Sequence, residues 1–455
     1  MSLEAINPST GETLAVYDEM TPEEVEIIIN QVNGAFSYWR RTGFAERADL
    51  LNRAAGVLRE QADKYAKVMT DEMGKPISDA RSEVEKCAWV CKYYAENGER
   101  FLQEETVETD ATKSFVTFQP LGIVLAVMPW NYPFWQVFRF AAAGLMAGNT
   151  VLLKHAANVP GCALAIEEIF AKAEFPENVF RIALVGSDKV DRIIENPLIK
   201  AVTLTGSVQA GKAVAKKAGT MLKKTVLELG GSDPYLILED AELEQAVETC
   251  VFSRLLNSGQ SCIAAKRFVV VASQREQFEN LFTQRMAEAK MGDPTSEDTE
   301  VGPQARLDLR EDLHRQVRQS IKSGATLLLG GKIPKGTGSF YPPTVLTDVR
   351  KGMPAYDEEL FGPVGAIVPV KDEEEAVQVA NETSFGLGAA VFTKDVARGE
   401  RIAAENLDAG CCFVNDFVRS DPRLPFGGIK DSGFGRELSH FGIREFVNIK
   451  TVVIK

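Results

Sequence analysis

Short apolar strands alternate with helix-forming stretches along most of this chain, and the alternation restricts the possible folds. The predicted strands of the first series cover residues 114–118, 121–128, 150–153, 180–185 and 201–204, and those that begin the second cover 234–238 and 268–271. A helix is expected at 242–256, and the alternation continues to Val414. This order is typical of parallel sheets covered by helices. We therefore expect an α/β fold with two parallel-sheet lobes joined near residue 230.

Both ends of the chain depart from this alternation. Thr21-Pro22-Glu23-Glu24 is a helix-start signal, and amphipathic helical sequence continues from there to about Phe101. The final segment, 446–455, is predicted to be a strand. Because a terminal strand exposes unpaired backbone groups, we expect it to pair with another strand, such as one of a neighbouring subunit.

Charge and composition exclude several classes of partner. The 455 residues carry a net charge of -13, which disfavours nucleic acid or an anionic membrane as the main partner. No apolar run has the length of a membrane span, and residues 1–17 lack a signal-peptide pattern. We expect a cytoplasmic protein without a membrane partner.

Cys262 is the candidate nucleophile. It ends the loop Asn257-Ser258-Gly259-Gln260-Ser261-Cys262, between a helix-like and a strand-like segment. A thiol on a glycine-bearing loop is open to attack on a substrate, although a small buried cysteine is the commoner alternative. With only three histidines, the chain disfavours a zinc site or a Cys-His catalytic pair. The seven cysteines are predicted to be reduced thiols.

Asn131 and Glu228 are candidate partners for such a nucleophile. Asn131 follows the strand at 121–128, at the edge where parallel sheets bind ligands. Glu228 lies between leucines and before two glycines, where burial would raise its pKa and suit a general base. The alternatives are a turn residue for Asn131 and a pairing with Lys223 for Glu228.

Two further features point to anions. Residues 205–213 follow a strand and open a helix, which suits phosphate, but Ala213 breaks the P-loop pattern and no GxGxxG occurs. Arg139 is the one charge in the apolar helix predicted at 134–140 and shares a face with Trp135. A buried guanidinium needs an anion, either an internal acid or a substrate carboxylate.

Together these motifs resemble the aldehyde dehydrogenase superfamily, most closely the short bacterial succinate-semialdehyde dehydrogenases. The ordered set is Pro129-Trp130-Asn131, Lys154, Thr205-Gly206-Ser207, Glu228-Leu229-Gly230-Gly231, Gly259-Gln260-Ser261-Cys262, Glu359-Leu360-Phe361-Gly362-Pro363 and Pro425-Phe426-Gly427-Gly428-Ile429-Lys430, and it covers nearly the whole chain. Arg139 and Ser420-Asp421-Pro422-Arg423 carry the narrower likeness.

The resemblance implies an aldehyde dehydrogenase fold in three parts. Residues 1–107 and 123–230 would form a Rossmann-like dinucleotide-binding domain, and 231–425 a catalytic domain. Residues 108–122 and 436–455 would form a β oligomerisation arm with the terminal strand, in a homodimer or homotetramer.

The resemblance also implies a covalent mechanism. Cys262 would attack the aldehyde to give a thiohemiacetal, Asn131 would hold the oxyanion, and Glu228 would activate water to hydrolyse the resulting thioester. The substrate would be succinic semialdehyde, which gives succinate. The alternatives are another aldehyde, a coenzyme-A-acylating enzyme and, in a different class, a cofactor-free thiol hydrolase.

By the same resemblance, the chain would bind NADP or NAD. The implied cofactor residues are Trp130, Lys154, Ala157, Thr205, Gly206, Ser207, Leu229, Glu359 and Phe361. NAD-preferring members often carry an acid at the position of Ala157, so we expect NADP to be accepted and preferred. The implied substrate residues are Trp135, Arg139, Ser261, Ser420 and Phe426, with Arg419 as a competitor of Arg139.

Overall fold

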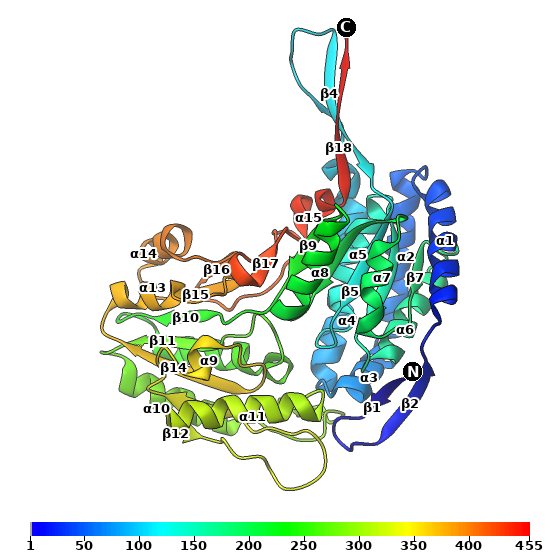
Figure 1. Cartoon of the computed structure of the whole chain (residues 1–455). Helices are drawn as coiled ribbons and strands as arrows, with labels where there is room; N and C mark the ends of the chain where they lie inside the picture. The colour runs from blue at the N-terminus through cyan, green and yellow to red at the C-terminus, as the bar shows by residue number, and fades with distance from the viewer. Residues whose placement is uncertain (1) are drawn as a thin grey trace.

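The computed structural model describes residues 2–455 and contains two helix-covered sheets and a projecting arm (Figure 1). The first sheet has six strands. Their order is β17 (Gly433–Phe434), β9 (Lys224–Glu228), β8 (Ile199–Thr205), β5 (Ile123–Met128), β6 (Thr150–His155) and β7 (Phe180–Ile182). All neighbours are parallel except β17, which pairs antiparallel with β9. The predicted parallel sheet is confirmed, but the return of residues 433–434 to it was not foreseen.

The helices of this lobe lie on both faces of its sheet and before it in the chain (Figure 1). They are α1 (Pro22–Trp39), α2 (Phe44–Glu60), α3 (Ala62–Met73), α4 (Ile77–Phe101), α5 (Trp135–Met146), α6 (Pro160–Lys172), α7 (Val190–Glu195), α8 (Val208–Thr220) and α15 (Ser439–Glu445). The predicted start of α1 is confirmed, because Thr21 and Glu24 form a reciprocal capping box. Every residue of α5 is buried, which explains why its sequence shows no polar face.

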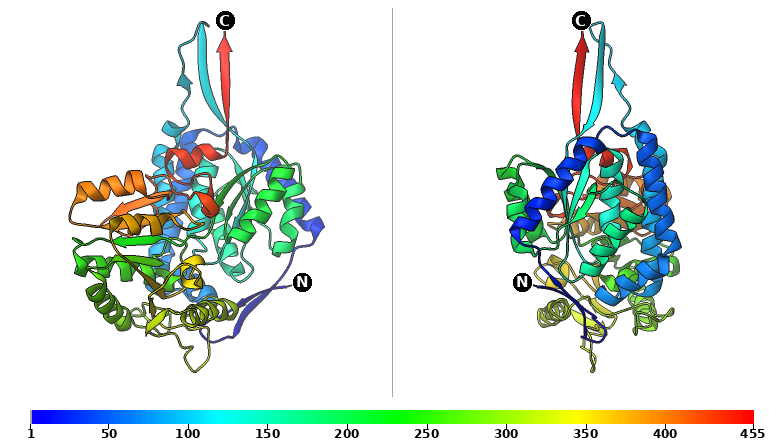
Figure 2. Two further views of the ribbon diagram at one scale, coloured as in Figure 1. Left: turned by 60° about the vertical axis from the view of Figure 1, so that its left-hand side comes forward. Right: turned by 90° about the vertical axis from the view of Figure 1, so that its right-hand side faces the viewer.

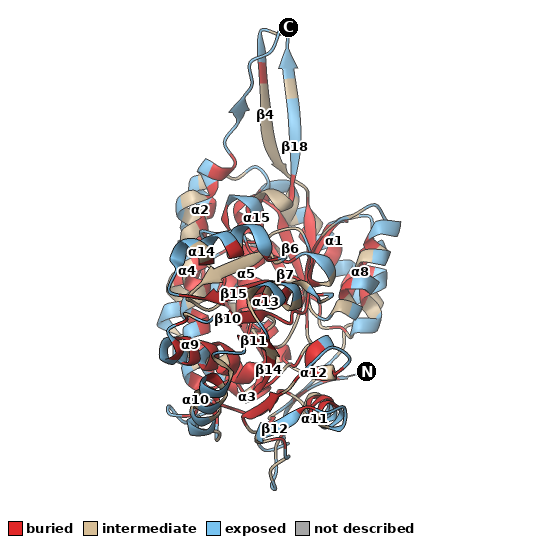
Figure 3. Cartoon of the chain, turned by 90° about the vertical axis from the view of Figure 1, so that its left-hand side faces the viewer, coloured by how far each residue is buried: buried red, intermediate tan, exposed pale blue. Residues whose placement is uncertain are grey.

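The second sheet has seven strands and again a mostly parallel order. From edge to edge it contains β12 (Thr326–Leu329), β13 (Thr344–Thr347), β14 (Val364–Val370), β11 (Arg267–Val271), β10 (Pro234–Ile237), β15 (Gly388–Phe392) and β16 (Cys411–Val414). Only β12 is antiparallel to its neighbour. The flanking helices are α9 (Leu243–Leu255), α10 (Arg275–Glu288), α11 (Leu307–Lys322), α12 (Pro354–Asp357), α13 (Glu373–Asn381) and α14 (Val396–Arg401). Most strands of both sheets are buried and form the centre of each lobe, whereas the edge strands β12 and β16 are exposed or partly exposed (Figure 3).

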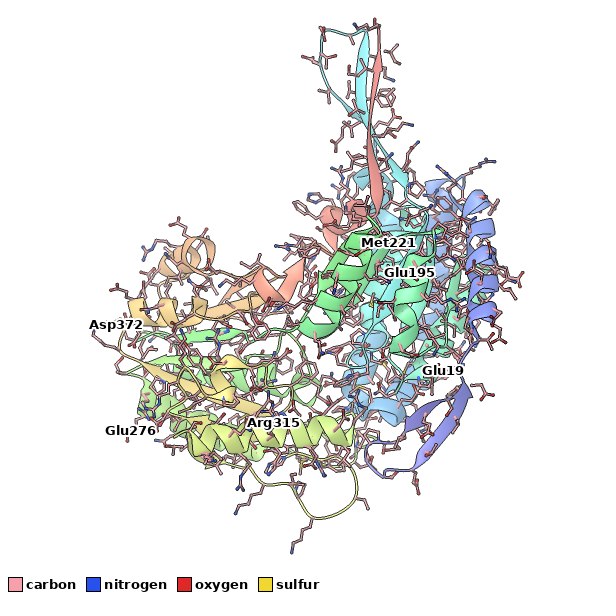
Figure 4. All side chains as sticks on the ribbon, in the orientation of Figure 1. Glu19, Glu195, Met221, Glu276, Arg315 and Asp372 are labelled. Atoms are coloured by element: carbon pink, nitrogen blue, oxygen red, sulfur yellow. The ribbon has the colours of Figure 1, made fainter. Side chains whose placement is uncertain are left out.

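A three-stranded antiparallel arm extends away from the two lobes (Figure 2). It contains β18 (Val447–Ile454), β4 (Lys113–Pro120) and β3 (Glu105–Thr106). The terminal strand therefore has a partner in its own chain, since β18 pairs with β4 from Val447–Pro120 to Ile454–Lys113. Within the described residues its other edge stays open, and the outer part of the arm projects away from the rest of the chain (Figure 4). At its base, Glu105 and Phe118 contact Arg444 of α15. At the opposite end, β1 (Ser2–Ile6) and β2 (Thr13–Asp18) form a hairpin.

Asn149 joins the arm to the first lobe. Its side chain is fully buried, its Oδ1 accepts hydrogen bonds from the backbone N–H groups of Leu121 and Gly122, and its Nδ2 donates to the carbonyl of Phe446. These hydrogen bonds hold the residues just before β5 and the residue just before β18 next to each other.

We predict that Asn149→Leu destabilises the protein by about 3 kcal/mol, because buried backbone groups lose their hydrogen-bond partners. Thermal melting of the two proteins checks this. The matched control is Asn30→Leu on α1, whose side chain is exposed and bonds only to the carbonyl of Glu26. Equal melting temperatures for Asn149→Leu and the control would contradict the prediction.

Candidate active site

Cys262 lies where two cavities meet between the lobes. One cavity, of about 420 Å³, contains residues that follow β5, β8 and β9, together with Glu359 and Phe361. The other, of about 340 Å³, is bounded by α4, α5 and residues 417–420. Cys262 and Gln136 belong to the walls of both. A nucleophile in this position is accessible from two sides.

The loop that carries Cys262 has an unusual backbone conformation. Asn257, Ser258 and Gly259 are consecutive left-handed residues, with φ of 55°, 56° and 74°. Glycine is required at 259, because a side chain there would collide with the backbone of Gly362. Non-glycine residues such as Asn257 and Ser258 are strained in the left-handed conformation, which persists only where other contacts stabilise it.

Side-chain hydrogen bonds hold this loop in place. The Asn257 N–H donates to Asp79 Oδ2 (2.9 Å), and Asn257 Nδ2 donates to the carbonyls of Asn131 (2.8 Å) and Gln260 (3.0 Å). Asn131 Nδ2 also donates to the Gln260 carbonyl, at 3.1 Å. The predicted oxyanion donor and the predicted nucleophile loop are thus joined directly.

Helix α4 fixes the start of α5 in the same way. Glu83 Oε1 accepts hydrogen bonds from the N–H groups of Phe134 and Trp135, both at 2.8 Å, and its other oxygen pairs with Lys75. Glu83 and Lys75 are both buried. A carboxylate at a helix N-terminus satisfies free backbone donors and the helix dipole, so Glu83 sets the position of the segment that follows Asn131.

Burial raises the pKa of two predicted catalytic groups, the Cys262 thiol and the Glu228 carboxyl. Burial raises the pKa of the Cys262 thiol to about 12, although the charges of Arg139 and Lys266 oppose this. Burial also raises the pKa of Glu228 well above its ordinary value. The predicted desolvation of Glu228 is confirmed, and its carboxylate has no hydrogen-bond partner in the described chain. The alternative partner, Lys223, binds the carbonyls of Ile194 and Asn196 instead.

Most of the predicted cofactor residues line the larger cavity: Trp130, Thr205, Gly206, Ser207, Leu229, Glu359 and Phe361. The rings of Trp130 and Phe361 meet edge to face at 5.6 Å. Ser207 caps α8, whose N-terminal amides suit a phosphate. A side chain at Gly230 would collide with the Glu359 carboxylate, so glycine leaves room for an acceptor of ribose hydroxyls. These residues fit a dinucleotide.

Lys154 and Ala157 are not part of this cavity wall. Lys154 is in β6, opposite Val127 of β5, and burial lowers its pKa. The charges of Asp188 and Glu19 oppose that shift, and Glu19 lies where β2 leads into α1 (Figure 4). Ala157 is exposed just beyond β6. Their role at the cofactor stays a prediction.

All five predicted substrate residues line the smaller cavity: Trp135, Arg139, Ser261, Ser420 and Phe426. Arg139 has an internal partner, the alternative that the sequence left open, because its guanidinium pairs with the buried carboxylate of Glu437. It also donates to Thr205 Oγ1 at 3.2 Å. The competitor Arg419 reaches this cavity but pairs with Asp416 at 2.6 Å.

Sequence reasoning missed the contributions of two helices. Helix α4 adds Asp79, Ser82, Glu83 and Lys86 to the smaller cavity, and the start of α11 adds Arg306, Leu309 and Asp312 to the larger one. The four-residue spacing of Asp79 and Glu83 places both carboxylates on one face of α4. This spacing was the only feature of the sequence that could have indicated their place in the site. Nothing local indicated that this face covers an active site.

Comparison with known proteins is consistent with this arrangement. The sequence matches the Aldehyde dehydrogenase family over residues 1–452. The chain belongs to the aldehyde dehydrogenase family. It is 49% identical to a probable succinate-semialdehyde dehydrogenase (NADP+) of Synechocystis, over 454 residues and 100% of each chain. It is 47% identical to succinate-semialdehyde dehydrogenase (NADP+) 1 of Mycobacterium tuberculosis, again over the whole of both chains.

A solved structure of a relative has the same fold as this chain. Succinic semialdehyde dehydrogenase from Streptococcus pyogenes, crystallised with NADP+ as the cofactor, superposes with a TM-score of 0.97 at 37% identity, and 99% of each chain is covered. The predicted fold class is therefore confirmed. In the described residues 2–455, no helix has both the length and the apolar character needed to cross a membrane.

We predict that alkylation of Cys262 by iodoacetamide accelerates about tenfold per pH unit between pH 7 and 9, without a plateau. The thiolate is the reactive form, and its fraction grows tenfold per unit as long as the pH stays below the raised pKa. Mass spectrometry of the peptide containing Cys262 measures the rate, and Cys262→Ala is the blank. A plateau near pH 7 would show that the resting protein stabilises the thiolate.

Proposed function

We propose that this protein oxidises succinic semialdehyde to succinate with NADP. The observation that carries the proposal is the place of Cys262 between a cavity that fits a dinucleotide and a second cavity that contains cationic side chains. An aldehyde bound in the second cavity would face the thiol. The similarity to succinate-semialdehyde dehydrogenases over the full chain supports the choice of substrate.

In the proposed mechanism, the Cys262 sulfur attacks the aldehyde carbon and forms a thiohemiacetal. The Asn131 amide and the Cys262 N–H would donate to the developing oxyanion, and loss of such a donor costs roughly 10²–10³ in rate. Asn131 Nδ2 already donates one of its hydrogens to the Gln260 carbonyl, which orients the amide before the substrate arrives and leaves its second hydrogen for the oxyanion. When bound, the nicotinamide supplies a hydride acceptor, which leaves the substrate as a thioester on Cys262.

Glu228 is the proposed base for hydrolysis of that thioester. Burial makes its carboxylate a stronger proton acceptor than a solvated glutamate, as activation of water requires. Because no hydrogen bond holds the carboxylate in the described chain, it can turn without losing one. Its neighbours Leu229 and Gly230 line the larger cavity, so a short movement would bring it to the site.

We propose that the chain is divided into domains as its resemblance to aldehyde dehydrogenases implies. Residues 1–107 and 123–230 would bind the dinucleotide, 231–425 would supply the nucleophile, and 108–122 with 436–455 would join subunits in a homodimer or homotetramer. The open edge of β18 and its exposed Ile449 (61%) and Val453 (55%) support a role of the arm in assembly. A cytoplasmic location stays a prediction.

The direct test is an aldehyde panel with NADP or NAD, with and without coenzyme A, in which reduced nicotinamide is followed. We expect succinic semialdehyde with NADP to be the best pair, without dependence on coenzyme A. Cys262→Ala should abolish turnover and still bind NADP, whereas Cys412→Ala, on β16, should keep full activity. A requirement for coenzyme A would favour the acylating alternative, and no signal with any pair would reject a dehydrogenase.

We expect Ala157→Glu to shift the cofactor preference toward NAD by about tenfold or more in kcat/KM, because an acid repels a 2′-phosphate and accepts a hydrogen bond from a 2′-hydroxyl. Binding of NADPH and NADH, measured by fluorescence, should shift in the same direction. Ala171→Glu, on the exposed face of α6, is the matched control. An unchanged preference would mean that residues other than Ala157 decide it.

A further inference from the structure

Lys266 is a fully buried lysine that the proposed mechanism does not use. It lies four residues after Cys262, immediately before β11. Its Nζ donates to three backbone carbonyls of the Cys262 turn (residues 261–264): those of Ser261 at 3.0 Å, Cys262 at 2.8 Å and Ala264 at 3.2 Å. An ammonium group has three hydrogens, so the three carbonyls match its full donor capacity, whereas a neutral amine could serve only two of them.

The backbone of Lys266 is held by the second sheet. Its N–H donates to the carbonyl of Asp233, just before β10, at 3.2 Å, and its own carbonyl accepts from the N–H of Ala366 in β14 at 3.1 Å. The side chain therefore starts from a rigid element and ends on the Cys262 turn. A contact of this kind holds a turn in one position relative to the sheet.

The charge of Lys266 is compensated inside the protein. Glu359 Oε1 lies 3.5 Å from its Nζ and also accepts a hydrogen bond from the Gly231 N–H at 3.0 Å. Burial lowers the pKa of the Lys266 ammonium. The carboxylates of Glu359 and Asp233 oppose this shift, and the Arg254 guanidinium adds to it. With carboxylates near it and all of its hydrogens on carbonyl oxygens, this lysine is suited to hold the turn rather than to bind an anionic ligand.

The hydrogen bond from Lys266 to the Ser261 carbonyl also determines where the Cys262 N–H points. This carbonyl and this N–H belong to one peptide unit, which is planar and trans, so the two groups point in opposite directions. Because the carbonyl is directed at Nζ, the N–H is directed away from the lysine. Within residues 2–455 this N–H has no hydrogen-bond acceptor. The peptide unit is therefore held from its carbonyl side, and its N–H stays available for a ligand.

We propose, on the basis of the proposed function, that Lys266 is a positioning residue that directs the Cys262 N–H toward the oxyanion of the thiohemiacetal. Lys266 is not part of either cavity wall, so it acts through the backbone of the Cys262 turn. A cationic donor on the carbonyl also polarises the peptide unit, which strengthens its N–H as a donor. Asn131 supplies the second donor of the proposed mechanism from the opposite lobe.

The test compares two reactions of the same thiol in Lys266→Met. Aldehyde oxidation develops an oxyanion, whereas alkylation by iodoacetamide does not. We expect the single-turnover rate of NADPH formation to fall about 10- to 100-fold, because a misdirected donor stabilises the transition state poorly. The rate of Cys262 alkylation at pH 8 should fall less than about threefold, since only the weaker effect of the lost charge on the thiol remains. Both rates are taken per NADPH-binding site, so that unfolded protein does not count.

Two further variants separate this role from a purely structural one. Lys266→Gln keeps two hydrogens for the turn without the charge, should lose about 3- to 10-fold in NADPH formation, and decides the question if Lys266→Met does not fold. Lys394→Met removes an exposed lysine of the same lobe, paired with Glu242, and should change neither rate. Equal losses in both reactions, faster alkylation, or unchanged NADPH formation in the Lys266 variants would overturn the proposal.

The wild-type protein separates this role from the proposed function. If it oxidises no aldehyde with NADP or NAD, the proposed function fails, and the role of Lys266 fails with it. If it oxidises an aldehyde in a reaction that Cys262→Ala abolishes, but both reactions of the thiol respond equally to the Lys266 variants, only the role of Lys266 fails.

Discussion

Two carboxylates of helix α4 hold the active site together. Asp79 accepts a hydrogen bond from the start of the loop that carries Cys262, and Glu83 accepts two from the start of α5, just after Asn131. The loop and α5 are far apart in the chain, and neither is held in this position by a strand ladder. One helix face therefore sets the relation between the proposed nucleophile and its proposed oxyanion donor. The left-handed residues of the loop persist because these bonds oppose their strain.

The cationic side chains of the site differ in whether a carboxylate of the chain pairs with them. Arg139 lines the smaller cavity and pairs with Glu437, and the pKa of Glu228 responds to the charges of both. Lys86 faces the cavity itself, on the same helix as Asp79 and Glu83. Lys86 is only partly buried and donates to Ser420, whereas Arg139 has a buried carboxylate partner.

Much of the fold was predictable from local sequence. The capping box at Thr21 and the apolar strands β5, β6 and β10 follow from capping chemistry and continuous burial. The predictions were wrong at some boundaries, since β7 ends at Ile182 rather than at 185. They also missed β17, because two residues that pair across the sheet with β9 leave no periodic pattern. Local sequence could not show the partner of β18 either, since the pairing depends on residues more than 300 positions away, and only the family resemblance placed both segments in one arm.

The sequence by itself determined which chemical groups the protein has: a thiol at Cys262, an amide at Asn131 and a carboxylate at Glu228, each next to turn or loop residues. Only the tertiary structure decided which of its charges have partners. Arg139 stood out in the sequence because it is alone in an apolar helix, yet Glu437 from the end of the chain compensates it. Pairing of charges depends on three-dimensional neighbours and burial, which no local pattern records.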